Sequence, residues 1–174
     1  MKKSTYTISI VLGILVASFP LVAGSLVGYY GQTEKGMQWY RNLNKPRYIP
    51  PSLVFAIAWP ILYIMLGLSF FTFLIHILHS LPLSSYSGVT IISYGLFLFF
   101  SNLAFNLMFP LFQFRFASLG GALLSCWLTW FTAILLLIFY ARYSNVYTIM
   151  LIIPYILWLS FACLMITHTY LLNR

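Results

Sequence analysis

Hydrophobic residues form five long runs along the chain, and shorter polar stretches separate them. Each run is long enough for an α-helix to cross the hydrocarbon core of a bilayer, which takes about 20 residues. The pattern predicts an all-α integral membrane protein, a five-transmembrane-helix bundle that forms a single domain over residues 1–174. The expected spans cover residues 6–28, 52–79, 88–112, 119–140 and 147–172.

The first run follows Lys2 and Lys3, and a basic start before an apolar run is also typical of a secretory signal peptide. The run at 6–28 is longer than the apolar region of such a peptide, so we interpret it as a retained first helix. Gly24 and Gly28 have the GxxxG spacing that lets two membrane helices approach closely. That spacing is common by chance in apolar segments, so it is a weak indication of a dimer.

Residues 29–51, with the sequence YYGQTEKGMQWYRNLNKPRYIPP, form a polar first loop that is rich in aromatic, basic and proline residues. This first loop is longer than most connections between helices in a bundle, and long loops of this kind usually carry function. We therefore expect the first loop to take part in ligand binding.

Composition supports a membrane protein. Hydrophobic residues make up 62% of the chain, charged residues only 6%, and the mean hydropathy is +0.96. Soluble domains carry about 25% charged residues, which keep their surfaces in water. A soluble monomer could not cover its surface with so few charges, so lipid is the expected solvent.

The charge is strongly basic, with nine Lys and Arg against the single acid Glu34. These charges are scattered rather than gathered on one face, so no nucleic-acid partner is expected. Basic residues collect in cytoplasmic loops of membrane proteins, which places the first loop and the C-terminus in the cytoplasm. Five spans put six basic residues on that side (Lys35, Arg41, Lys45, Arg47, Arg115, Arg174) and three on the other (Lys2, Lys3, Arg142).

Hydrolytic and redox motifs are missing from the sequence, which contains no carboxylate pair, HExxH, GxSxG or phosphate-binding glycine loop. No charged residue lies in the middle of a span, which argues against an ion-driven pump. We expect no metal site, because His76 and His79 lack a third ligand. Cys126 and Cys163 lie in apolar runs as buried small hydrophobes, and a disulfide would require their two helices to align them.

Two asparagines are the notable polar residues inside the spans. Asn102 and Asn106 are four positions apart, so they share one face of a helix. Amides at membrane depth need hydrogen-bond partners, which neighbouring helices or a ligand would supply. Both interpretations remain open at this point.

Aromatic residues suggest a second candidate feature. Trp59 and Tyr63 share a face of one predicted helix, and Trp158 and Ala162 share a face of another, with Tyr155 one turn earlier. A small residue one turn from a tryptophan leaves space beside a flat wall, which suits a planar apolar ligand. Ordinary packing of aromatics in an apolar core explains the same pattern.

Three segments resemble the translocator protein family, also called tryptophan-rich sensory proteins. Residues 39–67, WYRNLNKPRYIPPSLVFAIAWPILYIMLG, resemble its W-Y-x-x-L-x-K-P-x-W-x-P-P and V-F-x-x-x-W-x-x-L-Y motifs. The segment IIPYILWLSFA is similar to its L-P-Y-x-x-W-x-x-F-A motif, and residues 102–112 give a third, weaker match. The resemblance covers nearly the whole chain.

The resemblance implies a five-helix homodimer in which the first loop caps a cavity inside the bundle, here in a bacterial plasma membrane. Family members bind porphyrins and, in many cases, sterols and benzodiazepine-type compounds. It therefore implies a porphyrin or haem-like tetrapyrrole as ligand, with no required cofactor. The candidate ligand-binding residues are Trp39, Tyr48, Trp59, Tyr63, Asn102, Asn106, Tyr155, Trp158 and Ala162.

The sequence departs from the family pattern at four positions. Tyr48 and Phe105 stand where the family has tryptophan, and both keep an aromatic ring. Ser125 replaces an aspartate and Ile166 an asparagine, which removes two polar groups. The resemblance therefore implies a pocket more apolar than is usual in the family.

Three functions are compatible with these observations. The first is a sensor or carrier that binds a flat hydrophobic ligand in a Trp-lined pocket within the bundle. The second, and the only enzymatic candidate, is light-dependent porphyrin degradation with Trp59 and Trp158 as electron donors. The third is a structural or assembly protein with a vestigial cavity, which the replacements at Ser125 and Ile166 favour.

Overall fold

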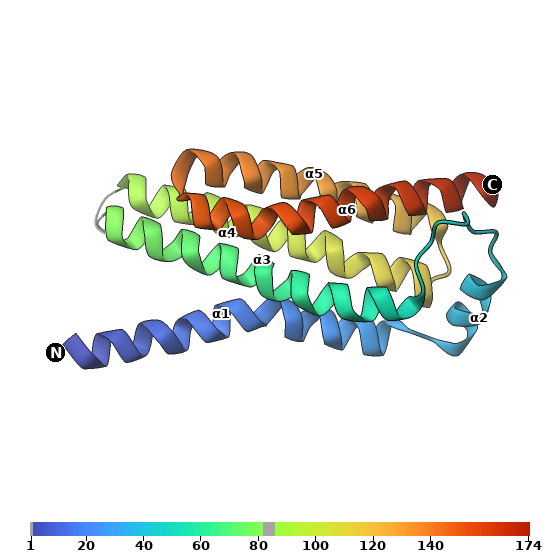
Figure 1. Ribbon diagram of the computed structural model, residues 1–174, viewed down its shortest axis with the longest axis horizontal. Helices are drawn as coiled ribbons and strands as arrows, with labels where there is room; N and C mark the ends of the chain where they lie inside the picture. Colours follow the sequence, from blue (N-terminus) through green and yellow to red (C-terminus); the bar gives the residue numbers. More distant parts are fainter. Residues whose placement is uncertain (1, 82–85) are drawn as a thin grey trace.

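The computed structural model describes the backbone of residues 2–81 and 86–174, and the side chains of residues 14–81 and 86–174. Within these ranges the chain forms a bundle of long helices that run roughly along one axis (Figure 1). Five of the described segments are long and apolar enough to cross a membrane, which confirms the predicted fold class. The elements are α1 (Lys2–Gly31), α2 (Glu34–Asn42), α3 (Ser52–Ser80), α4 (Tyr86–Pro110), the π-helical turn η1 (Leu111–Arg115), α5 (Leu119–Tyr143) and α6 (Val146–Leu172).

The end of the third span differs from the sequence prediction. The helix α4 ends at Pro110, and η1 carries the chain on as one wider turn before α5 begins. The Phe116 N–H donates to the Leu111 carbonyl at 3.0 Å, and the Ser118 N–H donates to the Phe112 carbonyl at 2.8 Å. These bonds satisfy carbonyls at the helix end, which would otherwise lack partners at the membrane boundary.

The first loop contains a short helix, α2, that the sequence analysis does not predict. Thr33 caps it by accepting a hydrogen bond from the Gly36 N–H at 3.1 Å, while its own hydroxyl donates to the Phe114 carbonyl at 3.0 Å. A Cβ atom at Gly36 would collide with that same carbonyl. Only glycine lets α2 rest directly on η1.

Helix α3 occupies the centre of the packing, because it contacts α1 on one side and α6 on the other. Helix α6 in turn packs on α5, and α5 on α4. Stacked rings join α3 to α4, since the Phe70 and Phe99 centroids lie 4.1 Å apart with 15° between their planes. Gly67 lets α1 approach α3, because a Cβ there would collide with the Ala17 backbone.

The first loop and the C-terminus lie at the same end of the bundle, and the N-terminus lies at the other (Figure 1). The Arg115 guanidinium donates to the Tyr30 carbonyl at 3.2 Å, which ties η1 to the start of the first loop at this end. The six basic residues expected on one side of the membrane therefore share one end of the molecule. That this end faces the cytoplasm stays a prediction.

Candidate ligand site

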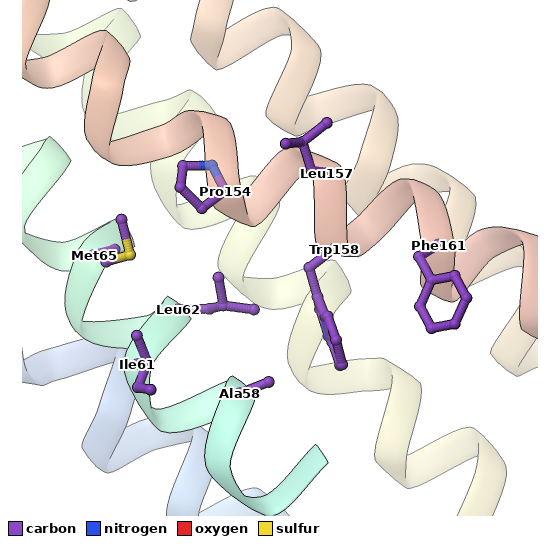
Figure 2. A pocket seen from close by; sticks show the side chains of 8 residues that line it. All are labelled: Ala58, Ile61, Leu62, Met65, Pro154, Leu157, Trp158 and Phe161. Carbon is purple, nitrogen blue, oxygen red and sulfur yellow. The ribbon is translucent and has the colours of Figure 1, made fainter. Parts of the chain in front are cut away.

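A groove of about 470 Å³ lies between α3 and α6, and Figure 2 shows side chains of both helices along it. This volume falls in the range of small-molecule sites. The groove opens on the lipid-facing surface, because Ile61 and Leu157 at its edges are 53% and 65% exposed. The residues that line it are Ala58, Ile61, Leu62, Met65, Pro154, Leu157, Trp158 and Phe161.

Trp158 provides the flat wall of the groove, and its indole projects from α6 toward the α3 segment that carries Ala58 (Figure 2). The Phe55 ring packs edge-on against the indole at 5.6 Å, and the Phe161 ring lies at 6.0 Å. The indole Nε1 is buried and has no hydrogen-bond partner within the described part of the chain. An unpaired buried N–H costs about 1–3 kcal/mol, so the packing around this indole carries that cost.

The first loop lies beside one end of this groove. The Tyr48 ring packs at 6.2 Å from the Phe161 ring and at 5.8 Å from the His168 ring. The Tyr48 hydroxyl and His168 Nδ1 are 2.5 Å apart and share a hydrogen bond. Because Phe161 also lines the groove, a ligand at that end would lie next to the loop.

Two reciprocal hydrogen bonds fasten the first loop to the end of α6. The Asn44 N–H donates to Asn173 Oδ1 at 2.9 Å, and Asn173 Nδ2 donates to the Asn44 carbonyl at 2.8 Å. Lys45 Nζ donates to the Arg41 carbonyl at 3.0 Å and lies 4.6 Å from the Tyr40 ring centroid. Desolvation lowers the pKa of Lys45, and burial raises the pKa of Tyr40.

A chain of buried hydrogen bonds runs through the centre of the bundle. The Tyr63 hydroxyl donates to Asn106 Oδ1 at 2.6 Å, and Asn106 Nδ2 donates to the Tyr155 oxygen at 3.1 Å. The Tyr155 hydroxyl then donates to Asn102 Oδ1 at 2.9 Å. Asn102 Nδ2 donates to the Thr129 carbonyl at 2.7 Å, so the chain joins α3, α4, α5 and α6. The two amides are paired within the protein, which is the interhelical role considered for them above.

A second, smaller space adjoins the hydrogen-bond chain. Its volume is about 20 Å³, which is room for about one water molecule. No flat ring system fits there without movement of the helices. The residues that line it are Trp59, Asn106, Phe109, Cys126, Thr129, Leu159 and Ala162.

Residues 16–171 match the TspO/MBR family. The chain belongs to this family. The tryptophan-rich protein TspO of Bacillus cereus is 31% identical over 141 residues, which cover 78% of this chain and 80% of that relative. The uncharacterized membrane protein YtaB of Bacillus subtilis is 31% identical over 151 residues, covering 87% and 88%. TspO of Chlorobaculum tepidum is 30% identical over 165 residues, covering 93% and 92%.

Family membership and the five apolar helices together establish a multi-pass membrane protein. The positions where this TspO/MBR chain departs from the expected motifs can now be placed. Ser125 is buried and donates to the Ala122 carbonyl at 3.0 Å. Ile166 is 4% exposed and packs in a small cluster with Ala122 and both cysteines. Ile166 therefore contributes to an apolar contact between α5 and α6, whereas the Ser125 hydroxyl is bonded within its own helix.

The candidate residues separate into groups in the structure. Trp59, Asn106 and Ala162 line the small interior cavity, whereas Trp158 lines the outer groove. Tyr48 contacts the groove end through Phe161. The remaining candidates line neither space, with Tyr63, Asn102 and Tyr155 in the adjoining hydrogen-bond chain and Trp39 half-buried on α2.

Most residues that line the groove are not among the candidates predicted from the sequence. Its walls follow helical spacing, at 58, 61, 62 and 65 on α3 and at 154, 157, 158 and 161 on α6. That i, i+3, i+4, i+7 pattern marks one face of each helix and is visible in the sequence. The pattern does not predict which two helix faces pack together, because every span is apolar on all sides.

Proposed function

We propose that this TspO/MBR member binds a flat hydrophobic ligand, a porphyrin or haem-like tetrapyrrole or else a sterol, in the groove between α3 and α6, as a sensor or carrier. The observation that supports this most directly is the apolar groove of about 470 Å³ with the Trp158 ring in its wall. Since the groove opens toward lipid, a hydrophobic ligand would enter from the bilayer rather than from water.

The chemistry of the groove favours a tetrapyrrole over a sterol. A planar conjugated ring stacks on an indole, and Trp158 supplies such a ring in the groove wall. Natural porphyrins also carry carboxylate side chains. The first loop beside the groove holds Lys45 and Arg47, whose positive charges suit carboxylates.

The contact between the groove and the first loop suggests how binding would be reported. Phe161 lines the groove and packs on Tyr48, so a ligand at that end would change how the loop packs on α6. A displaced first loop would then change the surface that this end of the molecule offers to other proteins. Family membership supports a sensor- or transporter-like role at the membrane.

Quenching of tryptophan fluorescence by protoporphyrin, titrated into the purified protein in mild detergent, tests the proposal. We expect saturable quenching that Trp158→Phe weakens by about threefold in Kd, since the smaller ring keeps only part of an aromatic contact that contributes about 0.5–1.5 kcal/mol. Trp127→Phe serves as the matched control, because Trp127 lies on α5 and lines neither space.

The variant Trp59→Phe separates the groove from the interior cavity. If Trp59→Phe weakens binding and Trp158→Phe does not, the ligand lies inside the bundle and the groove proposal is wrong. Absence of saturable quenching in the unmodified protein would refute ligand binding altogether.

A structural or assembly role is the second candidate, and the 20 Å³ interior favours it. A protein whose cavity is vestigial gains no stability from the ligand. Binding to the folded state alone would raise the unfolding temperature with ligand concentration. An unfolding temperature that is unchanged across the whole protoporphyrin titration would support assembly over sensing.

A further inference from the structure

Two thiols from different helices meet inside the bundle. Cys126 Sγ on α5 and Cys163 Sγ on α6 lie 3.2 Å apart, although 37 positions separate them in the chain. Both cysteines are free, and their exposed fractions are 4% and 0%. Helices α5 and α6 therefore bring the two cysteines side by side, as a disulfide between them would require.

The two sulfurs have different surroundings. Cys126 lines the small interior cavity beside Trp59, so a molecule in that cavity would reach its sulfur. Cys163 is not among the lining residues and is fully buried against Cys126 and Ile166. Cys126 thus lines the cavity, and Cys163 lies behind it in contact with its sulfur.

We propose that Cys126 and Cys163 form a redox-active dithiol, which small uncharged peroxides oxidise to a disulfide that crosslinks α5 to α6. This inference goes beyond the proposed ligand function and does not depend on it. A charged oxidant would be excluded by the apolar surroundings, whereas hydrogen peroxide is neutral and close to water in size.

The reaction takes two steps. The Cys126 sulfur first attacks a peroxide oxygen, the O–O bond breaks, and one water leaves as Cys126 becomes a sulfenic acid. The Cys163 sulfur then attacks the Cys126 sulfur, the S–O bond breaks, and a second water leaves as the disulfide forms. Two thiols are oxidised by two electrons and one peroxide is reduced to two waters, so the atoms balance.

The geometry makes the second step fast and the product persistent. The sulfurs must close from 3.2 Å to about 2.05 Å, a short movement for two adjacent helices. Neutral buried thiols react slowly with peroxides, so the first step sets the rate. Charged thiol reductants such as glutathione cannot reach two residues buried to this degree, so the crosslink would last once formed.

Hydrogen peroxide applied to the intact protein in detergent provides the test. After oxidation the protein is unfolded, free thiols are alkylated with a maleimide, and the chain is digested for mass spectrometry. We expect both thiols to disappear together, with one peptide pair joined through Cys126 and Cys163 and two hydrogens lost. Persistence of both free thiols, or disulfides between two copies of the chain, would overturn the proposal.

Single variants test the order of the two cysteines. In Cys163→Ala, Cys126 should accumulate as a sulfenic acid that dimedone traps on unfolding. In Cys126→Ala, Cys163 should stay reduced at the same peroxide dose. Equal oxidation of the remaining cysteine in the two variants would contradict the assignment of Cys126 as the first residue to react.

The peroxide experiment on the unmodified chain does not depend on the variants, so the proposal stays testable if Cys163→Ala or Cys126→Ala fails to fold.

Discussion

At the scale of single residues, the Tyr155 hydroxyl joins the two buried amides of α4. It donates to Asn102 and accepts from Asn106, so one oxygen serves both amides. Removal of that oxygen would leave an unpaired acceptor and an unpaired donor at membrane depth. The free-energy cost of leaving such a buried group unpaired is larger than the net stabilisation that its hydrogen bond provides.

We therefore predict that Tyr155→Phe lowers the free energy of unfolding by about 1–2 kcal/mol, the upper part of the range for interhelical hydrogen bonds in membranes. Tyr147→Phe is the matched control, because Tyr147 lies on the same helix and is 70% exposed. Unfolding in mixed micelles with a denaturing detergent measures both. Equal stabilities of the two variants would show that the hydrogen-bond chain contributes little.

At the scale of elements, close approach of helices depends on single glycines. Gly67 brings α3 against the Ala17 backbone of α1, and Gly24 of α1 lies against the Tyr63 ring. Gly24 belongs to the GxxxG pair, and its face is thus used within the chain. Gly28, the other member, has no neighbouring atom within 4 Å of an added Cβ.

Gly67→Ala should separate α1 from α3 and lower the unfolding temperature, because backbone atoms cannot move aside for a new Cβ. Gly28→Ala is the matched control and should be neutral or slightly stabilising, since alanine favours a helix over glycine by about 1 kcal/mol. Circular dichroism during heating measures both. A Gly67→Ala protein that melts at the wild-type temperature would contradict the close contact.

The clamp between the first loop and α6 leads to another element-scale prediction. Asn173→Ala removes both hydrogen bonds to Asn44, so amide exchange across residues 43–51 should speed up. Arg174→Ala, at the exposed neighbouring position, should leave that exchange unchanged. Hydrogen–deuterium exchange with peptide-level mass spectrometry distinguishes the two, and equal protection in both variants would argue against the clamp.

At the scale of the whole molecule, six of the nine basic residues share one end of the bundle, and the positive-inside rule assigns that end to the cytoplasm. In a Cys126→Ala, Cys163→Ala background, Lys35→Cys should react with a membrane-impermeant maleimide in inside-out vesicles and not in right-side-out ones. Tyr147→Cys, at the start of α6 and the other end, should show the reverse. Labelling of Lys35→Cys from outside would invert the topology.

The sequence by itself determined the fold class and the number of spans, because the thickness of a bilayer sets how long each apolar run must be. It also showed that Asn102 and Asn106 need partners, since amides cannot stay unpaired in hydrocarbon. The hydrophobic pattern did not predict helix α2, because the stability of this helix comes from the Thr33 cap and the contact of Gly36 with η1.

Only the tertiary structure decided which faces meet. Trp59 and Trp158 carry the same side chain, yet one faces an interior space of about 20 Å³ and the other an open groove of about 470 Å³. The helical period places residues on a face, but in spans that are apolar all round it does not say which helix that face will touch. For the same reason the meeting of Cys126 with Cys163 emerged only when α5 and α6 packed together.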